Sequence, residues 1–395
     1  MKSVRNLSRT VFLLGVASFF TDLSSEMIYP LLPVFLATVL HAGPLALGVV
    51  EGVAESTAAI LKVASGIWTD RARRRKPLIL AGYGLAGLAR PLIGLAQVWP
   101  FVLAMRFLDR VGKGLRTSPR DALIADVTEP GLRGTAFGVH RAMDHAGAVA
   151  GPLVAAGLLA FGGVTLGHVF LLSAIPAAIV MLVLVFGIRE APPPPAEPRL
   201  PFDWKALWTG TGRNFRMLLL ALLVFTLGNS TDAFLLLRLK DAGISASGVA
   251  MLWALHHAVK MVLTYLGGRL ADRVGRRTMI VLGWIVYAAV YFAFAQVTST
   301  AWLIVVFLAY GIYFGLTEPA EKALIADLVP KQLRGTAFGC YHGIIGLAAL
   351  PASLLFGVLW RTFGMAAAFY TGAALAAAAS VMLMMVKETS PEPGK

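Results

Sequence analysis

Twelve long apolar blocks constrain this chain more than any other feature of its sequence. Each is about 20 residues or more, the length that crosses the apolar core of a bilayer. In lipid a segment must satisfy its own backbone hydrogen bonds, and none of the blocks alternates as a barrel strand does. We therefore predict an all-α integral membrane protein with twelve transmembrane helices, at residues 10–38, 46–68, 77–97, 99–123, 134–162, 166–188, 216–239, 247–270, 277–297, 301–325, 335–360 and 365–386.

The composition agrees with a membrane protein and excludes a nucleic-acid-binding one. Hydrophobic residues make up 57% of the chain and charged residues 14%, against about 45–50% and about 25% in soluble proteins. The net charge of +14 lies in short segments between apolar blocks, without the single basic surface that nucleic acids require. One cysteine, Cys340, leaves no internal disulfide.

The positive charges set the expected orientation. We number the connections between the predicted helices from the N-terminus. Lysine and arginine concentrate in the N-terminus and in the even-numbered connections, such as DRARRRK (70–76) and DRVGRR (272–277). The odd-numbered connections are almost free of them. Positive loops stay in the cytoplasm. Both termini are therefore expected to be cytoplasmic in a multi-pass protein of the cell membrane, of the bacterial inner-membrane kind. The same rule assigns Arg116, Arg120, Arg133 and Arg334 to cytoplasmic connections.

Two phrases occur twice in the chain, about half its length apart. LIADVTEPGLRGTAFG (123–138) recurs as LIADLVPKQLRGTAFG (324–339), and GIWTDRARRRKPLIL (66–80) recurs as GRLADRVGRRTMIVL (268–282). The matching offsets indicate one duplication. A proline-rich stretch lies at the midpoint, where four consecutive prolines cannot continue a helix. We predict two pseudo-symmetric six-helix bundles, residues 1–188 and 216–395, joined by a cytoplasmic linker at 189–215.

The second repeated phrase resembles the loop between helices 2 and 3 of major facilitator superfamily (MFS) transporters, Gly-x-x-x-Asp-Arg-x-Gly-Arg-Arg. The N-terminal copy departs from it at Arg73, where the family usually has glycine. The resemblance covers the whole chain and implies the MFS fold, in which this loop clasps the cytoplasmic ends of the halves in the outward-facing state. It implies conformational-gate roles for Gly66, Asp70, Arg71, Gly268, Asp272, Arg273, Gly275 and Arg276.

A glycine pattern in the fifth helix is similar to a motif of the family's antiporters and drug exporters. It consists of Gly138, Gly147, Gly151 and Pro152. Glycines at this spacing allow close helix contact, and the proline bends the helix. Generic small-residue packing is the alternative interpretation. The C-terminal copy lacks the pattern, and this asymmetry favours export.

Ionisable residues within the apolar blocks are the candidate substrate and proton pathway, because charges at this depth are costly and usually functional. We expect them to pair, with an arginine neutralising a carboxylate that binds and releases a proton. A static ion-pair network is the alternative. In the resembled family helices 1, 4, 7 and 10 line the cavity. The candidates are Asp22, Glu26, Glu55, Arg106, Asp109, Arg110, Arg141, Asp144, His145, Asp232, His257 and Glu318.

The predicted function is secondary active transport by alternating access, as proton-coupled efflux of a small organic compound by a monomeric antiporter. Uptake of a nutrient or of a metal or metal chelate is the alternative, and a membrane receptor or sensor is a weaker one. His257 and Met261 alone are too few ligands for a metal site. No hydrolase or nucleotide-binding motif is present, so we expect no enzyme and no cofactor.

Overall fold

The computed structural model describes residues 7–42, 44–72, 74–161, 163–188, 190, 212–230, 232–244 and 246–386, and this part of the chain is helical without a strand. Eight helical segments in it are long and apolar enough to cross a membrane. The other expected spans lie in α3, α5, α10–α11 and α12, so each of the twelve predicted blocks corresponds to helix. Arg189, residues 191–211 and hence most of the predicted linker lie outside the described residues.

The N-terminal group of helices corresponds to the first six predicted spans. Its elements are α1 (Arg9–Glu26), η2 (Tyr29–Leu31), α2 (Leu32–Thr38), α3 (Pro44–Ala72), α4 (Lys76–Leu92), η3 (Ile93–Leu95), α5 (Trp99–Asp126), η4 (Pro130–Leu132), α6 (Arg133–Phe161), α7 (Leu166–Leu172), α8 (Ala174–Leu182) and the π-helical turn η5 (Val183–Gly187).

The C-terminal group corresponds to the last six spans. Its elements are α10 (Gly212–Gly228), α11 (Ala233–Asp241), α12 (Ala246–Val274), α13 (Arg276–Gln296), α14 (Thr300–Leu328), η6 (Lys331–Leu333), α15 (Arg334–Phe363) and α16 (Met365–Met384). Gly275 separates α12 from α13 with a φ of 104°, a conformation that favours glycine. The equivalent turn of the first group contains Arg73, which lies outside the described residues.

Three spans that the sequence predicts as continuous helices are interrupted. The first breaks after Glu26 into η2 and α2, where Pro30 and Pro33 have no amide hydrogen to donate. The seventh breaks between α10 and α11, after Gly228. The sixth breaks at Ser173, between α7 and α8, and Pro176 follows in the first turn of α8. Hydrophobicity alone does not locate such breaks.

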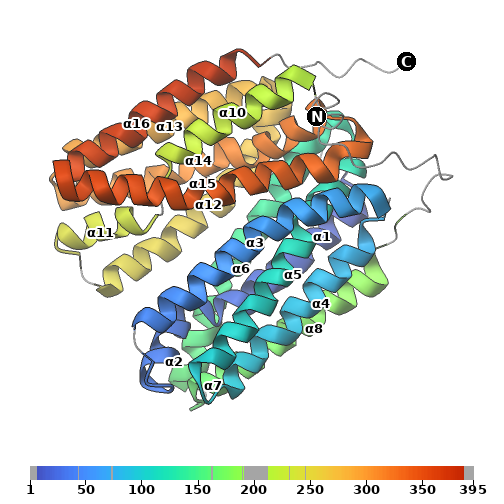
Figure 1. The fold of residues 1–395 in the computed structure, drawn as a ribbon, viewed down its shortest axis with the longest axis vertical. Helices are drawn as coiled ribbons and strands as arrows, with labels where there is room; N and C mark the ends of the chain where they lie inside the picture. The colour runs from blue at the N-terminus through green and yellow to red at the C-terminus, as the bar shows by residue number, and fades with distance from the viewer. Residues whose placement is uncertain are drawn as a thin grey trace.

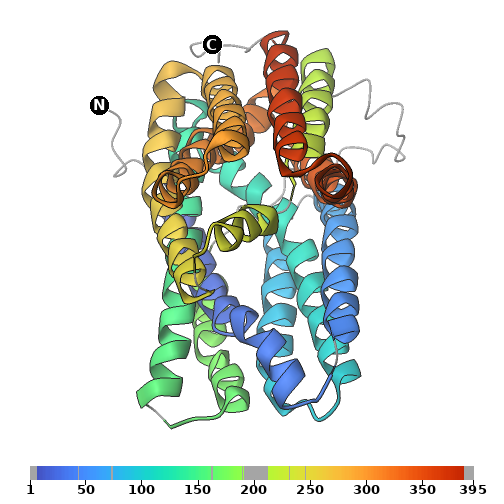
Figure 2. The same cartoon turned by 90° about the vertical axis from the view of Figure 1, so that its left-hand side faces the viewer.

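The two groups lie on opposite sides of the molecule and come together at one end (Figures 1 and 2). Between the groups, α6 lies against α12 and α3 lies against α15. Within the N-terminal group, α1 packs against α6, and α5 packs against α3 and α4. We call the end where α3 and α12 finish and α6 and α15 begin the closed end.

Glycines allow the two groups to approach backbone to backbone near the closed end. A Cβ atom added at Gly66 of α3 would lie 2.2 Å from the carbonyl oxygen of Gly335 in α15. A Cβ atom added at Gly268 of α12 would lie 2.3 Å from the carbonyl oxygen of Gly134 in α6. The two contacts occupy equivalent positions of the duplicated sequence, so the closed end is formed twice by the same glycine arrangement.

We predict that Gly66→Ala weakens the closed end, because the methyl group collides with backbone atoms that cannot move aside. The midpoint of thermal unfolding in detergent should fall by about 2–4 °C. Gly157→Ala, also in a helix, is the matched control. Among the described residues, no atom outside the neighbouring turns of α6 lies within 4 Å of a Cβ added there. Equal melting temperatures for the two variants would contradict the proposed contact.

Candidate functional site

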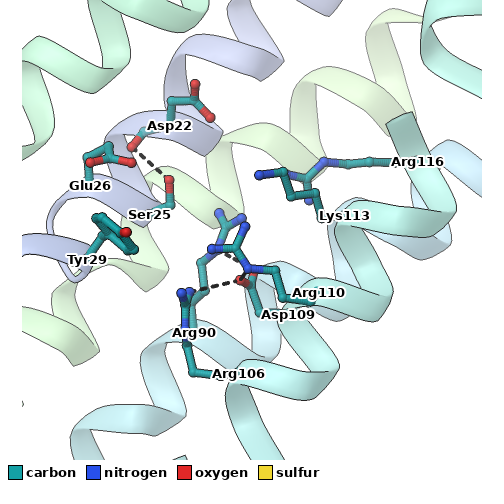
Figure 3. A pocket seen from close by; sticks show the side chains of 10 residues that line it. All are labelled: Asp22, Ser25, Glu26, Tyr29, Arg90, Arg106, Asp109, Arg110, Lys113 and Arg116. Atoms are coloured by element: carbon teal, nitrogen blue, oxygen red, sulfur yellow. Dashed lines mark hydrogen bonds and ion pairs between the residues drawn. The ribbon is translucent and has the colours of Figure 1, made fainter. Parts of the chain in front are cut away.

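A polar cavity of about 270 Å³ lies inside the N-terminal group, between α1, α4 and α5 (Figure 3). Five of its lining residues are predicted substrate-pathway candidates, namely Asp22, Glu26, Arg106, Asp109 and Arg110. Three cations outside that prediction also line the cavity, together with one serine and one tyrosine. The additional lining residues are Arg90, Lys113, Arg116, Ser25 and Tyr29.

Asp109 is the centre of a buried ion cluster on one side of the cavity. It accepts a hydrogen bond from Arg90 Nε at 2.6 Å and another from Arg106 Nη1 at 3.3 Å. Arg110 Nε lies 3.8 Å from the same carboxylate. Arg90 also donates to the carbonyl oxygen of Thr21 at 3.0 Å. The cluster therefore ties α5 to α4 and, through Arg90, to α1.

A second cluster joins the two groups of helices. Arg141 of α6 donates two hydrogen bonds to Glu318 of α14, at 2.9 and 2.6 Å, and a third to Asp144 at 2.7 Å. His145 Nε2 lies 3.4 Å from Glu318 Oε2, the oxygen that also accepts from Arg141 Nε, and Ser18 of α1 donates to Asp144. The structure thus brings together four of the predicted pathway residues, and one arginine holds carboxylates from both groups.

The remaining pathway candidates lie at the edge of this second cluster or apart from it. The ring centroid of His257 is 5.5 Å from that of His145. Asp232 accepts a hydrogen bond from Tyr310 at 2.9 Å and, among the described residues, has no hydrogen bond or ion pair with the other candidates. Glu55 belongs to α3, but its side chain lies outside the described residues.

A third buried cluster, which the sequence analysis did not identify, also crosses between the groups. Asp121 of α5 pairs with Lys322 of α14 at 2.8 Å and with His342 of α15 at 2.9 Å. Arg120 lies 3.0 Å from the same carboxylate. The sequence contained a signal, because Arg120 and Asp121 align with Glu321 and Lys322 in the duplicated halves. The first half thus has a positive residue followed by a negative one, and the second half has the same pair in the opposite order.

At the closed end, each copy of the repeated loop phrase meets the other copy of the repeated LRGTAFG phrase. Asp70 of α3 accepts hydrogen bonds from the amides of Gly335 and Thr336, at 2.9 and 2.6 Å, in the first turn of α15. Arg75 also donates to Asp70, at 2.6 Å. A carboxylate at a helix N-terminus interacts favourably with the helix dipole.

The second contact repeats the first with the groups exchanged. Asp272 of α12 accepts hydrogen bonds from the amides of Gly134 and Thr135, at 2.8 and 2.7 Å, and from the Thr135 hydroxyl at 2.6 Å. Arg276 lies 3.3 Å from Asp272. We call the Asp70 and Asp272 contacts, with their arginines and backbone amides, the two latches.

Ion pairs between the ends of the helices surround the latches. Arg133 of α6 donates to Asp327 of α14, and Arg276 lies 2.9 Å from the same carboxylate. Arg334 of α15 donates to Asp126 of α5 at 2.8 Å. The sequence analysis took Arg133 and Arg334 only as charges of cytoplasmic connections. Both arginines are instead buried and form ion pairs with aspartates of other helices. Setting the orientation in the membrane therefore does not account for all of their function.

The latch carboxylates lie beyond the predicted spans 46–68 and 247–270. Burial raises the pKa of Asp70 above the ordinary value for aspartate, against the opposing influence of Arg75. Burial likewise raises the pKa of Asp272, against the hydrogen bonds from Thr135. In both cases the donors only partly offset the cost of removing the carboxylate from water.

The other predicted gate and packing residues lie in the same region or along α6. Arg71 and Arg273 are exposed beside the latches. Gly138 approaches Thr264 and Gly268 of α12, so it belongs to the contact between the groups. Gly147 and Gly151 instead meet α1, where added Cβ atoms would lie 2.3 Å from the Phe19 oxygen and 2.7 Å from Glu26 Cβ.

Pro152 lies inside α6, which continues past it to Phe161. The glycines ahead of it hold the part of α1 that carries Asp22 and Glu26 close to α6. Gly147 and Gly151 therefore position the part of the cavity that Asp22 and Glu26 line.

Comparison with known proteins assigns the family. The sequence profile of the Major Facilitator Superfamily matches residues 14–255 and 218–395. The chain belongs to the major facilitator superfamily. It is 32% identical over 388 residues to an uncharacterised MFS-type transporter of Methanocaldococcus jannaschii, covering 97% of this chain and 96% of that one. It is 24% identical over 378 residues to the multidrug resistance protein MdtG of Escherichia coli, covering 92% and 91%.

Solved structures of the superfamily share the fold. The human organic anion transporter MFSD10 superimposes with a TM-score of 0.83 at 16% identity, covering 95% of this chain and 99% of that one. The fucose:proton symporter of Escherichia coli superimposes with a TM-score of 0.77 at 15% identity, covering 96% and 98%. This facilitator is thus a multi-pass membrane transporter with the twelve-helix MFS fold of two pseudo-symmetric six-helix bundles.

We predict that Asp272→Ala opens one latch, because it leaves the amides of Gly134 and Thr135 without their acceptor. Hydrogen exchange in the first turn of α6 should become about tenfold faster or more, as charge-assisted bonds of this kind are lost. Asp241→Ala, an exposed aspartate in α11, is the control. Unchanged exchange at residues 133–136 in Asp272→Ala would show that the latch does not restrain α6.

Proposed function

We propose that this transporter is a monomeric, proton-coupled antiporter that exports a small organic compound across the cell membrane by alternating access. The observation that carries the proposal is the arginine bridge between the helix groups. Arg141 of α6 holds Glu318 of α14 in a two-point ion pair and Asp144 of its own helix in a third contact. A movement that separates α6 from α14 must break this bridge.

Breaking the bridge provides a reason for protons to take part. A buried carboxylate that loses its arginine costs several kcal/mol if it stays charged. Taking up a proton removes that cost. Glu318 therefore alternates between an ion-paired state in the observed conformation and a protonated state when the groups rearrange. His145 lies beside it and provides a neighbouring proton carrier.

The two latches supply the second requirement of alternating access, a seal on one side. We assign the closed end to the cytoplasm, following the expected position of both termini, so that the observed conformation is outward-facing. In this assignment residues 1–188 and 216–395 are the moving bodies and 189–215 is their cytoplasmic linker. Release of Asp70 and Asp272 from α15 and α6 opens the path toward the cytoplasm.

Two observations favour export over uptake of a nutrient or metal chelate. The glycine pattern of the fifth helix resembles the motif of the family's antiporters and is present in only one half. One relative that covers nearly the whole chain carries the name of a multidrug resistance protein. Export from the cytoplasm also agrees with a protein of the bacterial inner membrane.

We expect gradient-driven transport to depend on Glu318. The purified protein is reconstituted into liposomes loaded with a soluble cell extract, a pH gradient is imposed, and mass spectrometry follows which compounds leave. The wild type should release at least one compound only when the gradient is present, and Glu318→Gln should abolish this release because it can no longer exchange a proton. Asp241→Asn, at the surface of α11, should transport as the wild type does.

Two outcomes would contradict the proposal. One is that the wild type moves no compound in response to the gradient in either direction. The other is that Glu318→Gln retains the full dependence on pH.

A further inference from the structure

The cavity of the N-terminal group has two walls of opposite charge. One wall, from α4 and α5, carries five cations around Asp109, and the other, from α1, carries Asp22 and Glu26. Figure 3 shows the α1 carboxylates on one side of the space and Lys113 and Arg116 on the other. A ligand between the walls therefore meets negative charge at one end and positive charge at the other.

Part of the basic wall is already neutralised by the protein itself. The Asp109 carboxylate lies within 4 Å of the guanidinium groups of Arg90, Arg106 and Arg110, with the closest approach at 2.6 Å. This cluster is built from adjacent helices and does not need a ligand to hold its carboxylate. The other two cations that line the cavity, Lys113 and Arg116, lie outside this cluster.

Arg116 retains an unused donor. Its side chain is 5% exposed, and its guanidinium lies 4.3 Å from the centre of the Tyr83 ring. Within the described part of the chain its Nη1 atom has no hydrogen-bond partner. Buried donors almost always have a partner in folded proteins. An acceptor arriving in the cavity satisfies this atom, and a carboxylate is the acceptor that arginine binds best.

The acidic wall is also incomplete. Asp22 and Glu26 lie one helical turn apart on the same face of α1. Among the described residues, neither carboxylate has an ion-pair partner within 4 Å, and the Ser25 hydroxyl donates to the backbone carbonyl of Asp22 and not to its carboxylate. Carboxylates at membrane depth are costly without a cation or a proton. A ligand ammonium group supplies the missing cation.

We propose that the cavity binds a small zwitterion, with its ammonium group at Asp22 and Glu26 and its carboxylate at Lys113 and Arg116. The cavity volume of about 270 Å³ lies at the lower limit of the about 300–1,000 Å³ of small-molecule sites, which suits an amino-acid-sized compound. This inference names a substrate class for the proposed function. It rests on that function only in assuming that the cavity lies on the transport path.

The proposal also connects substrate binding with proton movement. A proton on Asp22 or Glu26 removes the negative charge that the ligand ammonium needs, so proton and ligand compete for the same wall. Competition of this kind is the requirement for exchange in opposite directions. The two-wall arrangement thus assigns the substrate class that an antiporter with this cavity can carry.

The test measures binding to the purified full-length protein in detergent by titration calorimetry. The probes are two zwitterions, 4-aminobutyrate and 6-aminohexanoate, and three charge-altered compounds, succinate, 1,4-diaminobutane and butyramide. At least one zwitterion should bind about tenfold more tightly than each charge-altered compound, because only it pairs with both walls. The affinity should fall as the pH is lowered far enough to protonate the acidic wall.

The variants separate the two ends of the ligand. Asp22→Asn should weaken zwitterion binding about tenfold without weakening succinate, and Arg116→Gln should weaken both zwitterion and succinate by the same factor. Lys113→Gln is the second variant of the basic wall if Arg116→Gln does not fold. Arg269→Gln, an arginine that lies 5.8 Å from the Tyr265 ring outside the cavity, is the matched control. Melting temperature and size-exclusion profile report whether each variant is folded.

The proposal is overturned if neither zwitterion binds at about 10 mM, if any of the three charge-altered compounds binds as tightly, or if all folded wall variants bind like the wild type. These outcomes are separable from failure of the proposed function. Zwitterion binding without gradient-driven flux contradicts the antiport proposal and leaves the site in place. Gradient-driven flux of other compounds without zwitterion binding overturns the site alone.

Discussion

A charged side chain inside a bilayer is costly unless it faces a water-filled cavity or a partner of opposite charge. This constraint organises the interior of the facilitator. Asp109 gathers arginines from α4 and α5, Arg141 joins α6 to α14, and Asp121 joins α5 to α14 and α15. The last two clusters satisfy their charges across the boundary between the helix groups. Separation of the groups therefore changes the protonation or pairing of charged residues at the same time.

The closed end follows a different rule, since its two latch carboxylates bind backbone amides. Asp70 and Asp272 each bind the first turn of a helix from the opposite group. The glycines on both sides of each contact bring the helices close enough for this to occur. The two repeated phrases of the sequence are therefore complementary surfaces. One phrase supplies the carboxylate, the other supplies the amides, and duplication supplied both to each half.

The sequence predicted the helices well because membrane spans depend on a simple property, the length of an apolar block. It did not locate the breaks after Glu26 and Gly228, because backbone hydrogen bonding and not hydrophobicity decides them. For the candidate site, the sequence identified Asp109, Asp144 and Glu318, since each is a conspicuous charge in an apolar segment. It did not assign Arg90, and it treated Arg116, Arg133 and Arg334 as loop charges. Their partners lie on other helices, and pairing between helices is set by packing.

Duplication of the latch has an energetic consequence for the balance between the two conformations. The Asp70 and Asp272 contacts lie on different helix pairs and share no residue, so their free energies add to a first approximation. If the two contribute equally, their combined effect on the ratio of closed to open molecules is the square of the effect of one. Two modest contacts thus bias this ratio as strongly as a single contact of twice the free energy. In the proposed alternating-access cycle, each latch then dissociates against only its own share of that free energy.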